Sequence, residues 1–128
     1  LACDAGAVQA DRFAALDALV DHFGCAVVLK GPGTLVAAPG EATSLLPGAH
    51  PALGVGGTGD VLAGLVAGLL AQGMTASDAC RAAAWLHAAA AVGLGEARER
   101  DRLPSELARE VAVAMQRLAP TAAPGAWD

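Results

Sequence analysis

The chain has 128 residues, of which 55% are hydrophobic and only 3% aromatic, so we expect one domain with a core of small side chains. Its formal charge of −5 comes from interspersed acidic and basic residues without a basic stripe, which argues against nucleic-acid and anionic-membrane partners. The longest uncharged stretch, Val61–Ser77, holds only about a dozen densely apolar residues, too few to span a membrane.

The start of the chain and its cysteines indicate in which cellular compartment we expect the protein. The first residues, LACDAGAVQADRF, lack an initiator methionine and a basic segment, which does not predict a signal peptide and suggests a cut inside a longer protein. Cys3, Cys25 and Cys80 are odd in number and far apart, which fits neither a disulfide framework nor the spacing of metal ligands. We interpret them as buried thiols of a cytoplasmic protein.

The first predicted element in chain order is an amphipathic helix from about Val8 to His22. Gly24 follows it, where a left-handed C-terminal cap is favoured. The apolar side chains expected on one face of this helix are Phe13, Leu16, Leu19, Val20 and Phe23.

Three short strands are predicted next. Ala26–Leu29 (AVVL) is apolar and partly β-branched, which is typical of a strand buried on both faces of a parallel sheet. Thr34–Ala38 (TLVAA) is expected as a second strand after a GPG turn, and Thr43–Leu46 (TSLL) as a third. Because a parallel sheet needs more strands, we expect part of the sheet to be missing. This chain alone should then expose the unpaired edge of a strand, and we expect such an edge to allow the chain to form a homo-oligomer.

Three helices complete an α/β pattern. The first ends near Gly73, the second runs from about Ser77 to Leu94 with Ser77 or Asp78 as its cap, and the third covers Pro104–Leu118. The first of them has an apolar face formed by Leu62, Leu65, Val66 and Leu69. Its other face is small enough for close backbone approach and consists of Ala63, Gly64, Ala67, Gly68 and Ala71. We expect residues 96–102 to be a solvated connector, residues 1–118 the domain and residues 119–128 a flexible tail.

The segment GVGGTGDVLAG, Gly54–Gly64, places five glycines and one carboxylate directly before this first helix. Amides at a helix start point outward and the helix dipole adds positive charge, which together favour an anion site. The predicted phosphate cradle comprises Gly56, Gly57, Thr58 and Gly59. A carboxylate beside it would repel a bound phosphate, which favours Asp60 as a base that activates a hydroxyl for phosphoryl transfer. The alternative is that Asp60 is an ordinary N-cap.

The segment VVLKGPGT carries the only lysine of the chain, Lys30, at the end of the first strand. Open α/β sheets bind ligands at the carboxyl ends of their strands, where an ammonium group suits a phosphate. The alternative is a solvated lysine before a tight turn. Together with the glycine-rich segment, Lys30 favours a phosphate-containing ligand.

These two segments, followed by AAAWLHAAAA, closely resemble the ADP-dependent NAD(P)H-hydrate dehydratases of the ribokinase-like superfamily. The resemblance extends from Val8 to about Leu118. It implies a three-layer α/β/α sandwich with the nucleotide at its C-terminal half. It also implies a reaction in which the S-epimer of hydrated NADH or NADPH is dehydrated, with ADP as phosphoryl donor, AMP and phosphate as products and Mg²⁺ as a cofactor.

The resemblance also implies roles for individual residues. Asp60 corresponds to the residue that contacts the hydrated nicotinamide and deprotonates its hydroxyl. The implied adenine-nucleotide contacts are Lys30, Gly31, Pro32, Gly33, Thr34 and Gly59. No protein ligand set for a metal is implied, and the partners are small molecules. Two departures stand out: AHPALGV at 49–55 replaces an Asn-Pro-Gly-Met-Ala-Thr-like lead, and the family's N-terminal half with its Pro-His-Pro-Gly-Glu-like segment is not in this chain.

Two histidines and two alternatives to the dehydratase function are also considered. We interpret His50 as a solvated loop residue, as most loop histidines are, with contact to the substrate as the alternative. We interpret His87 as a packed helix residue, because no second histidine or carboxylate is spaced to share a metal with it. A ribokinase-like kinase of a vitamin-precursor alcohol would share the cradle and the base. A nucleotide-binding module without activity is the other alternative, and the isolated chain is expected to show little turnover.

Overall fold

The computed structural model describes residues 4–46, 48, 50–94 and 103–118. Its elements in chain order are α1 (Ala5–Ala10), α2 (Arg12–Phe23), β1 (Val27–Leu29), β2 (Thr34–Ala37), β3 (Ser44–Leu46), the 3₁₀ helix η1 (Pro51–Gly54), α3 (Thr58–Ala71), α4 (Ala76–Gly93) and α5 (Pro104–Leu118). The expected connector, the expected tail and Cys3 lie outside the described residues. None of the described helices combines the length and the apolar character needed to cross a bilayer.

The three strands form one sheet in the order β1-β2-β3, and both pairings are antiparallel. In the register, Val28 pairs with Val36, and Leu35 pairs with Leu45. The expectation of parallel strands is therefore wrong for the strands described here, because the connections between them are too short for a crossover. The expectation that Ala26–Leu29 is buried on both faces is also wrong. Each residue of β1 is half-buried, since β1 lies at the edge of this sheet.

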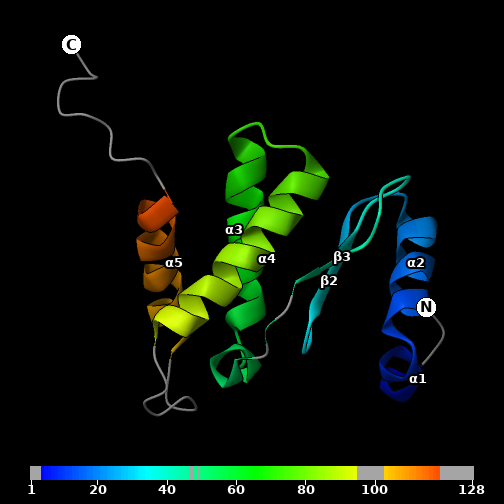
Figure 1. Cartoon of the computed structure of the whole chain (residues 1–128), viewed down its shortest axis with the longest axis horizontal. Coiled ribbons are helices and arrows are strands. Elements are labelled where there is room, and N and C mark those ends of the chain that lie inside the picture. Colours follow the sequence, from blue (N-terminus) through cyan, green and yellow to red (C-terminus); the bar gives the residue numbers. More distant parts are fainter. Residues whose placement is uncertain (1–3, 47, 49, 95–102, 119–128) are drawn as a thin grey trace.

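Helices cover both faces of the sheet, so the described residues form three layers (Figure 1). Side chains alternate along β2, which places Leu35 and Ala37 against α2 and Val36 against α4. The helix side chains in these two contacts are Leu16 and Val20 of α2 and Cys80 and Ala84 of α4. This confirms the predicted α/β class with its α/β/α layering. On the helix–helix side of the molecule, α3 and α5 pack on α4. In these contacts the buried residues of α4 are alanines, in line with the small side chains that the composition predicts, and those of α3 and α5 are leucine and valine.

The predicted first helix is divided into α1 and α2. Asp11 caps α2 by accepting a hydrogen bond from the Ala14 amide at 2.9 Å, and this interrupts the helix. The predicted apolar face is only partly buried, because Phe13 and Phe23 are 53% and 61% exposed. Gly24 confirms the predicted left-handed cap with φ of 62°.

Two further expectations need correction. The N-cap of α4 is Thr75, whose hydroxyl accepts from the Asp78 amide at 3.2 Å, so neither Ser77 nor Asp78 caps the helix. Cys25 is exposed, whereas Cys80 is buried as expected and burial raises the pKa of its thiol. The apolar face of α3 is confirmed, and its face of small residues is exposed.

Candidate functional site

A glycine-rich loop precedes α3, and backbone hydrogen bonds within the loop hold its shape. Gly57 is the N-cap with φ of 91°, and a Cβ there would lie 2.9 Å from Pro104 Cγ, so this position requires glycine. The amides of Thr58 and Asp60 donate to the Val55 and Gly57 carbonyls at 3.3 and 3.1 Å. Within the described part of the chain, the remaining amides of this loop donate no hydrogen bond, and they belong to Gly56, Gly57 and Gly59. These three amides are available to an anion at the positive end of the helix dipole.

Lys30 and the start of α3 come together although Lys30 and Thr58 are 28 residues apart in the sequence. Lys30 is half-buried, and its Nζ donates to Thr58 Oγ1 at 3.3 Å. Burial lowers the pKa of Lys30, and the nearby Asp60 carboxylate opposes this shift. The two segments that each favour a phosphate-containing ligand therefore lie together, with an ammonium group facing a helix N-terminus.

Asp60 lies in the first turn of α3 and is exposed. It is not the N-cap, because Gly57 holds that position and no side chain makes a capping bond. The alternative of an ordinary cap is therefore wrong for Asp60. Its carboxylate is close enough to Lys30 to interact electrostatically and remains accessible to a ligand.

The turn between β1 and β2 has an anchor that the sequence did not reveal. Gly33 has φ of 67°, its amide donates to the Gly48 carbonyl at 3.4 Å, and Thr34 Oγ1 donates to the Gly31 carbonyl at 3.4 Å. Across the turn, the guanidinium of Arg12 donates to three backbone carbonyls. The sequence offered only a weak signal for Arg12, an arginine that follows a helix cap.

His87 is buried in helix α4, which confirms the predicted packed residue, but its contact with the start of α3 was not predicted from the sequence. The side chain is 3% exposed, and its Nε2 lies 2.8 Å from the Thr58 carbonyl oxygen. Because a carbonyl only accepts, Nε2 carries the proton in this contact. Burial lowers the pKa of His87, with the charge of Lys30 acting in the same direction and the hydrogen bond to Thr58 opposing it. A neutral His87 thus supports the start of α3 from the core.

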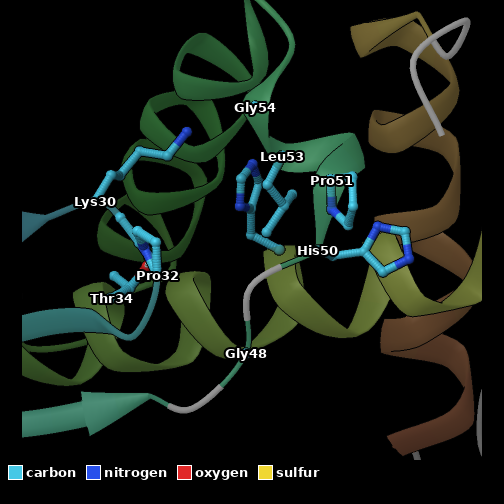
Figure 2. Close-up of a pocket in the computed structure, with 10 residues that line it drawn as sticks. Lys30, Pro32, Thr34, Gly48, His50, Pro51, Leu53 and Gly54 are labelled. Carbon is cyan, nitrogen blue, oxygen red and sulfur yellow. Dashed lines mark hydrogen bonds between the residues drawn. The ribbon is translucent and has the colours of Figure 1, made fainter.

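A cavity of 320 Å³ lies beside the β1–β2 turn. Figure 2 shows Lys30, Pro32 and Thr34 on one side of it and His50, Pro51 and Leu53 on the other. Its full lining is Lys30, Gly31, Pro32, Thr34, Gly48, His50, Pro51, Leu53, Gly54 and His87. Four of the five residues of the predicted nucleotide segment therefore line one cavity.

The predicted cradle lies next to this cavity rather than inside it. Gly59 lines a separate groove of 380 Å³ between β1 and α3, and Lys30 lines both spaces. Lys30 is thus the side chain that joins the two. The predicted site residues that line neither space are Gly33, Gly56, Gly57, Thr58 and Asp60.

His50 has a local structural role. Its Nδ1 accepts from the Ala52 amide at 3.3 Å and so caps η1. The side chain also lines the first cavity and an adjoining apolar cavity of 430 Å³ that includes Trp85. His50 is therefore half-buried and partnered, unlike the solvated loop residue that the sequence predicts.

Comparison with protein families gives a match to the model described as NAD(P)H-hydrate dehydratase over residues 1–112. The bifunctional NAD(P)H-hydrate repair enzyme Nnr of Vibrio cholerae is 45% identical over 91 residues, which are 71% of this chain and 18% of that protein. The ADP-dependent (S)-NAD(P)H-hydrate dehydratase of Neisseria meningitidis is 48% identical over 84 residues, 66% of this chain and 28% of that protein. This chain thus spans well under half the length of these relatives.

Solved structures show the same similarity. Bacillus subtilis YxkO, described as a UPF0031 member and a putative kinase, gives a TM-score of 0.82 at 27% identity, over 91% of this chain and 44% of that one. The ADP/ATP-dependent NAD(P)H-hydrate dehydratase of Bacillus subtilis, co-crystallised with ATP and Mg²⁺, gives 0.78 at 28% identity, over 88% of this chain and 41% of that one.

Proposed function

Because this chain belongs to the NAD(P)H-hydrate dehydratase family, we propose that the protein dehydrates hydrated NADH and NADPH at the expense of ADP, in the repair of nicotinamide nucleotides. The Neisseria relative is named for the same donor and for the (S) epimer. The observation that carries the proposal is the meeting of Lys30, the start of α3 and Asp60 at one end of β1. This arrangement suits transfer of a phosphoryl group to a hydroxyl.

The nucleotide is proposed to lie along the β1–β2 turn. The segment Lys30–Thr34 borders the cavity, and the Lys30 ammonium at its end is suited to the diphosphate. The three available amides at the start of α3 then face the phosphoryl group that is transferred. Gly59 belongs to both parts, because it lies at the helix start and in the groove that Lys30 also lines.

Asp60 is proposed as the catalytic base. It takes the proton of the hydroxyl on the hydrated nicotinamide ring, and the hydroxyl oxygen attacks the β-phosphorus of ADP while AMP leaves. The new O–P bond turns the ring's hydroxyl oxygen into part of a phosphate leaving group. The ring C–O bond then breaks, phosphate departs with the bonding electron pair, and loss of a proton from the neighbouring ring carbon restores NADH or NADPH. The exposed Asp60 carboxylate, which lies near the Lys30 ammonium group, is suited to the first of these steps because a substrate hydroxyl can reach it directly.

Mg²⁺ fits this site only together with the nucleotide. Among the described residues no three histidine, cysteine or acidic side chains gather into a metal site. Mg²⁺ is commonly held by substrate phosphates, waters and one or two carboxylates. We propose that the nucleotide brings the ion and that the Asp60 carboxylate lies near it; the ion would then neutralise phosphate charge.

The remaining proposals concern the whole protein. Residues 1–118 are proposed to be the C-terminal nucleotide-binding part of a dehydratase domain of a cytoplasmic protein. One edge of β1 has no neighbouring strand among the described residues, which supports self-association of this chain. Sedimentation of the chain tests this, and a single monomeric species would contradict it.

The activity is tested with the full protein, the (S) hydrate of NADH and ADP. We expect the absorbance of NADH to recover only when ADP is present, with one AMP formed per NADH. Turnover of a thiazole or pyrimidine alcohol with none of the hydrate would instead assign the protein to the kinases. Binding of ADP without turnover of either substrate would assign it to the inactive nucleotide-binding modules.

A further inference from the structure

Arg12 connects α2 to the turn that follows β1. It is the first residue of α2, and its Nη1 donates to the Pro32 and Gly33 carbonyls at 2.6 and 2.9 Å. Its Nη2 donates to the Leu29 carbonyl at 3.0 Å. These carbonyls lie before and within the segment Lys30–Thr34. One planar group therefore holds the turn at both of its ends.

In the described part of the chain, the groups that face the charge of Arg12 are backbone carbonyl dipoles. In residues 4–46, 48, 50–94 and 103–118, no carboxylate forms an ion pair with it, and its Nε is buried without a hydrogen-bond partner. A guanidinium keeps its charge at all physiological pH values, and its fork fixes the directions of several acceptors at once. The three carbonyls are thus oriented toward Arg12.

Gly31 is adapted to this contact. A Cβ at position 31 would lie 2.9 Å from Nη2 and 3.0 Å from Cζ of Arg12, closer than side chains approach one another. Glycine at this position therefore allows the guanidinium to lie against the turn. The close approach couples the conformation of the turn to the position of Arg12.

We propose that Arg12 is a positioning residue for the nucleotide: it fixes the turn Lys30–Thr34 so that this segment is ready to bind ADP. This inference rests on the proposed function. Arg12 lines none of the three cavities, so it acts through the turn and not by touching the ligand. A preformed turn binds with less loss of conformational entropy than a mobile one.

The test compares Arg12→Met with Arg81→Met in the full protein. Arg81 is a matched control: like Arg12 it is half-buried, lines none of the three cavities and joins a helix to the sheet region. It donates to Ser44 Oγ at 3.0 Å and to Glu41 at 2.7 Å, and not to the turn Lys30–Thr34. We expect both variants to lower the melting temperature. Only Arg12→Met should raise the Kd and the KM for ADP, by about 10-fold to 100-fold, a typical cost of misplaced binding groups. The KM for hydrated NADH should stay unchanged.

Two further variants keep the proposal testable if Arg12→Met folds poorly. Arg12→Lys retains the charge but not the fork, so we expect an intermediate Kd for ADP; a wild-type Kd would overturn the proposal. Gly31→Ala strains the backbone in both backgrounds, since Gly31 has φ of 156°, but it meets the guanidinium only in the wild type. It should therefore weaken ADP binding more in the wild type than in the Arg12→Met background. Equal effects in both backgrounds would also overturn it.

The failure of this proposal differs from failure of the proposed function. If the wild-type protein neither binds ADP nor uses it to dehydrate the hydrate, the proposed function is wrong. If the wild type does both, and Arg12→Met binds ADP as tightly as Arg81→Met, the function stands and the role of Arg12 is refuted.

Discussion

The two glycine-rich segments of the site are held in place by different physical means. The turn Lys30–Thr34 is held from α2 by the charged guanidinium of Arg12. The start of α3 is held from the core by the neutral ring of His87 and by the Thr58 hydroxyl, which also accepts a hydrogen bond from Lys30. An arginine keeps its charge at any physiological pH, whereas a buried histidine stabilises its loop best while it is neutral, because burying a charged ring costs free energy. Two segments of similar composition should therefore respond differently to mutation and to pH.

The largest effect is expected from Asp60→Asn, which tests whether Asp60, in the second segment, contributes to catalysis and not to the stability of the fold. Asn retains the shape of the side chain but cannot accept the proton, so turnover should fall roughly 10²-fold or more, the usual scale for removal of a general base. Asp60 is exposed and does not cap α3, so the melting temperature should hardly change. Kinetics and thermal unfolding of the same preparation measure both quantities. Near-normal turnover would remove Asp60 from the reaction.

The next effect concerns Lys30, the side chain that joins the two segments. Lys30→Met keeps the apolar stem and removes the charge, so the Kd for ADP should rise by about 10-fold or more, as expected for a charged hydrogen bond to phosphate. Titration calorimetry with ADP and with AMP distinguishes the phosphate contact from the base contact. The loss should be larger for ADP; an equal loss for both would indicate that Lys30 does not contact the β-phosphate.

A smaller effect should come from the backbone of the second segment. Gly57→Ala places a Cβ at a left-handed residue and against Pro104, so the free energy of unfolding should fall by about 1–3 kcal/mol. Gly64→Ala is the matched control on the same helix, because its Cβ would meet nothing within 4 Å. That change should be neutral or stabilise by up to about 1 kcal/mol, since alanine favours the helix. Urea unfolding of the two variants gives the comparison, and similar losses would contradict it.

The smallest effect is the pH dependence that His87 gives to the second segment. In the folded protein the pKa of His87 lies below the ordinary value of 6.5, so the unfolded chain binds the proton more readily. The stability from the neutral ring is therefore present above about pH 6.5 and decreases as the pH falls toward the lowered pKa of the folded state. His87→Gln keeps a donor for the Thr58 carbonyl but does not titrate. Urea unfolding at several pH values should show that the wild type loses more stability than this variant below pH 6.5; parallel curves would contradict the assignment.

The elements of the fold were predictable where periodicity and caps agree. The apolar face of α3, the cap at Gly24 and the three strands follow from local sequence. The parallel sheet and the buried Phe13 and Phe23 did not hold. Periodicity reports which side chains share a face, but not which face finds a partner, and an apolar strand has the same composition in either direction of pairing.

By itself, the sequence determined the chemistry that this protein brings to its site: a single lysine after a strand, glycines that free a helix start, and one carboxylate in its first turn. These features are local, because each depends on a few neighbouring residues. The tertiary structure decided which groups hold them. Arg12 reaches the Leu29 carbonyl 17 residues away, and His87 reaches the Thr58 carbonyl 29 residues away. Both bond to backbone atoms, which every residue has, so no pattern of side chains in the sequence could identify these partners before the layers packed together.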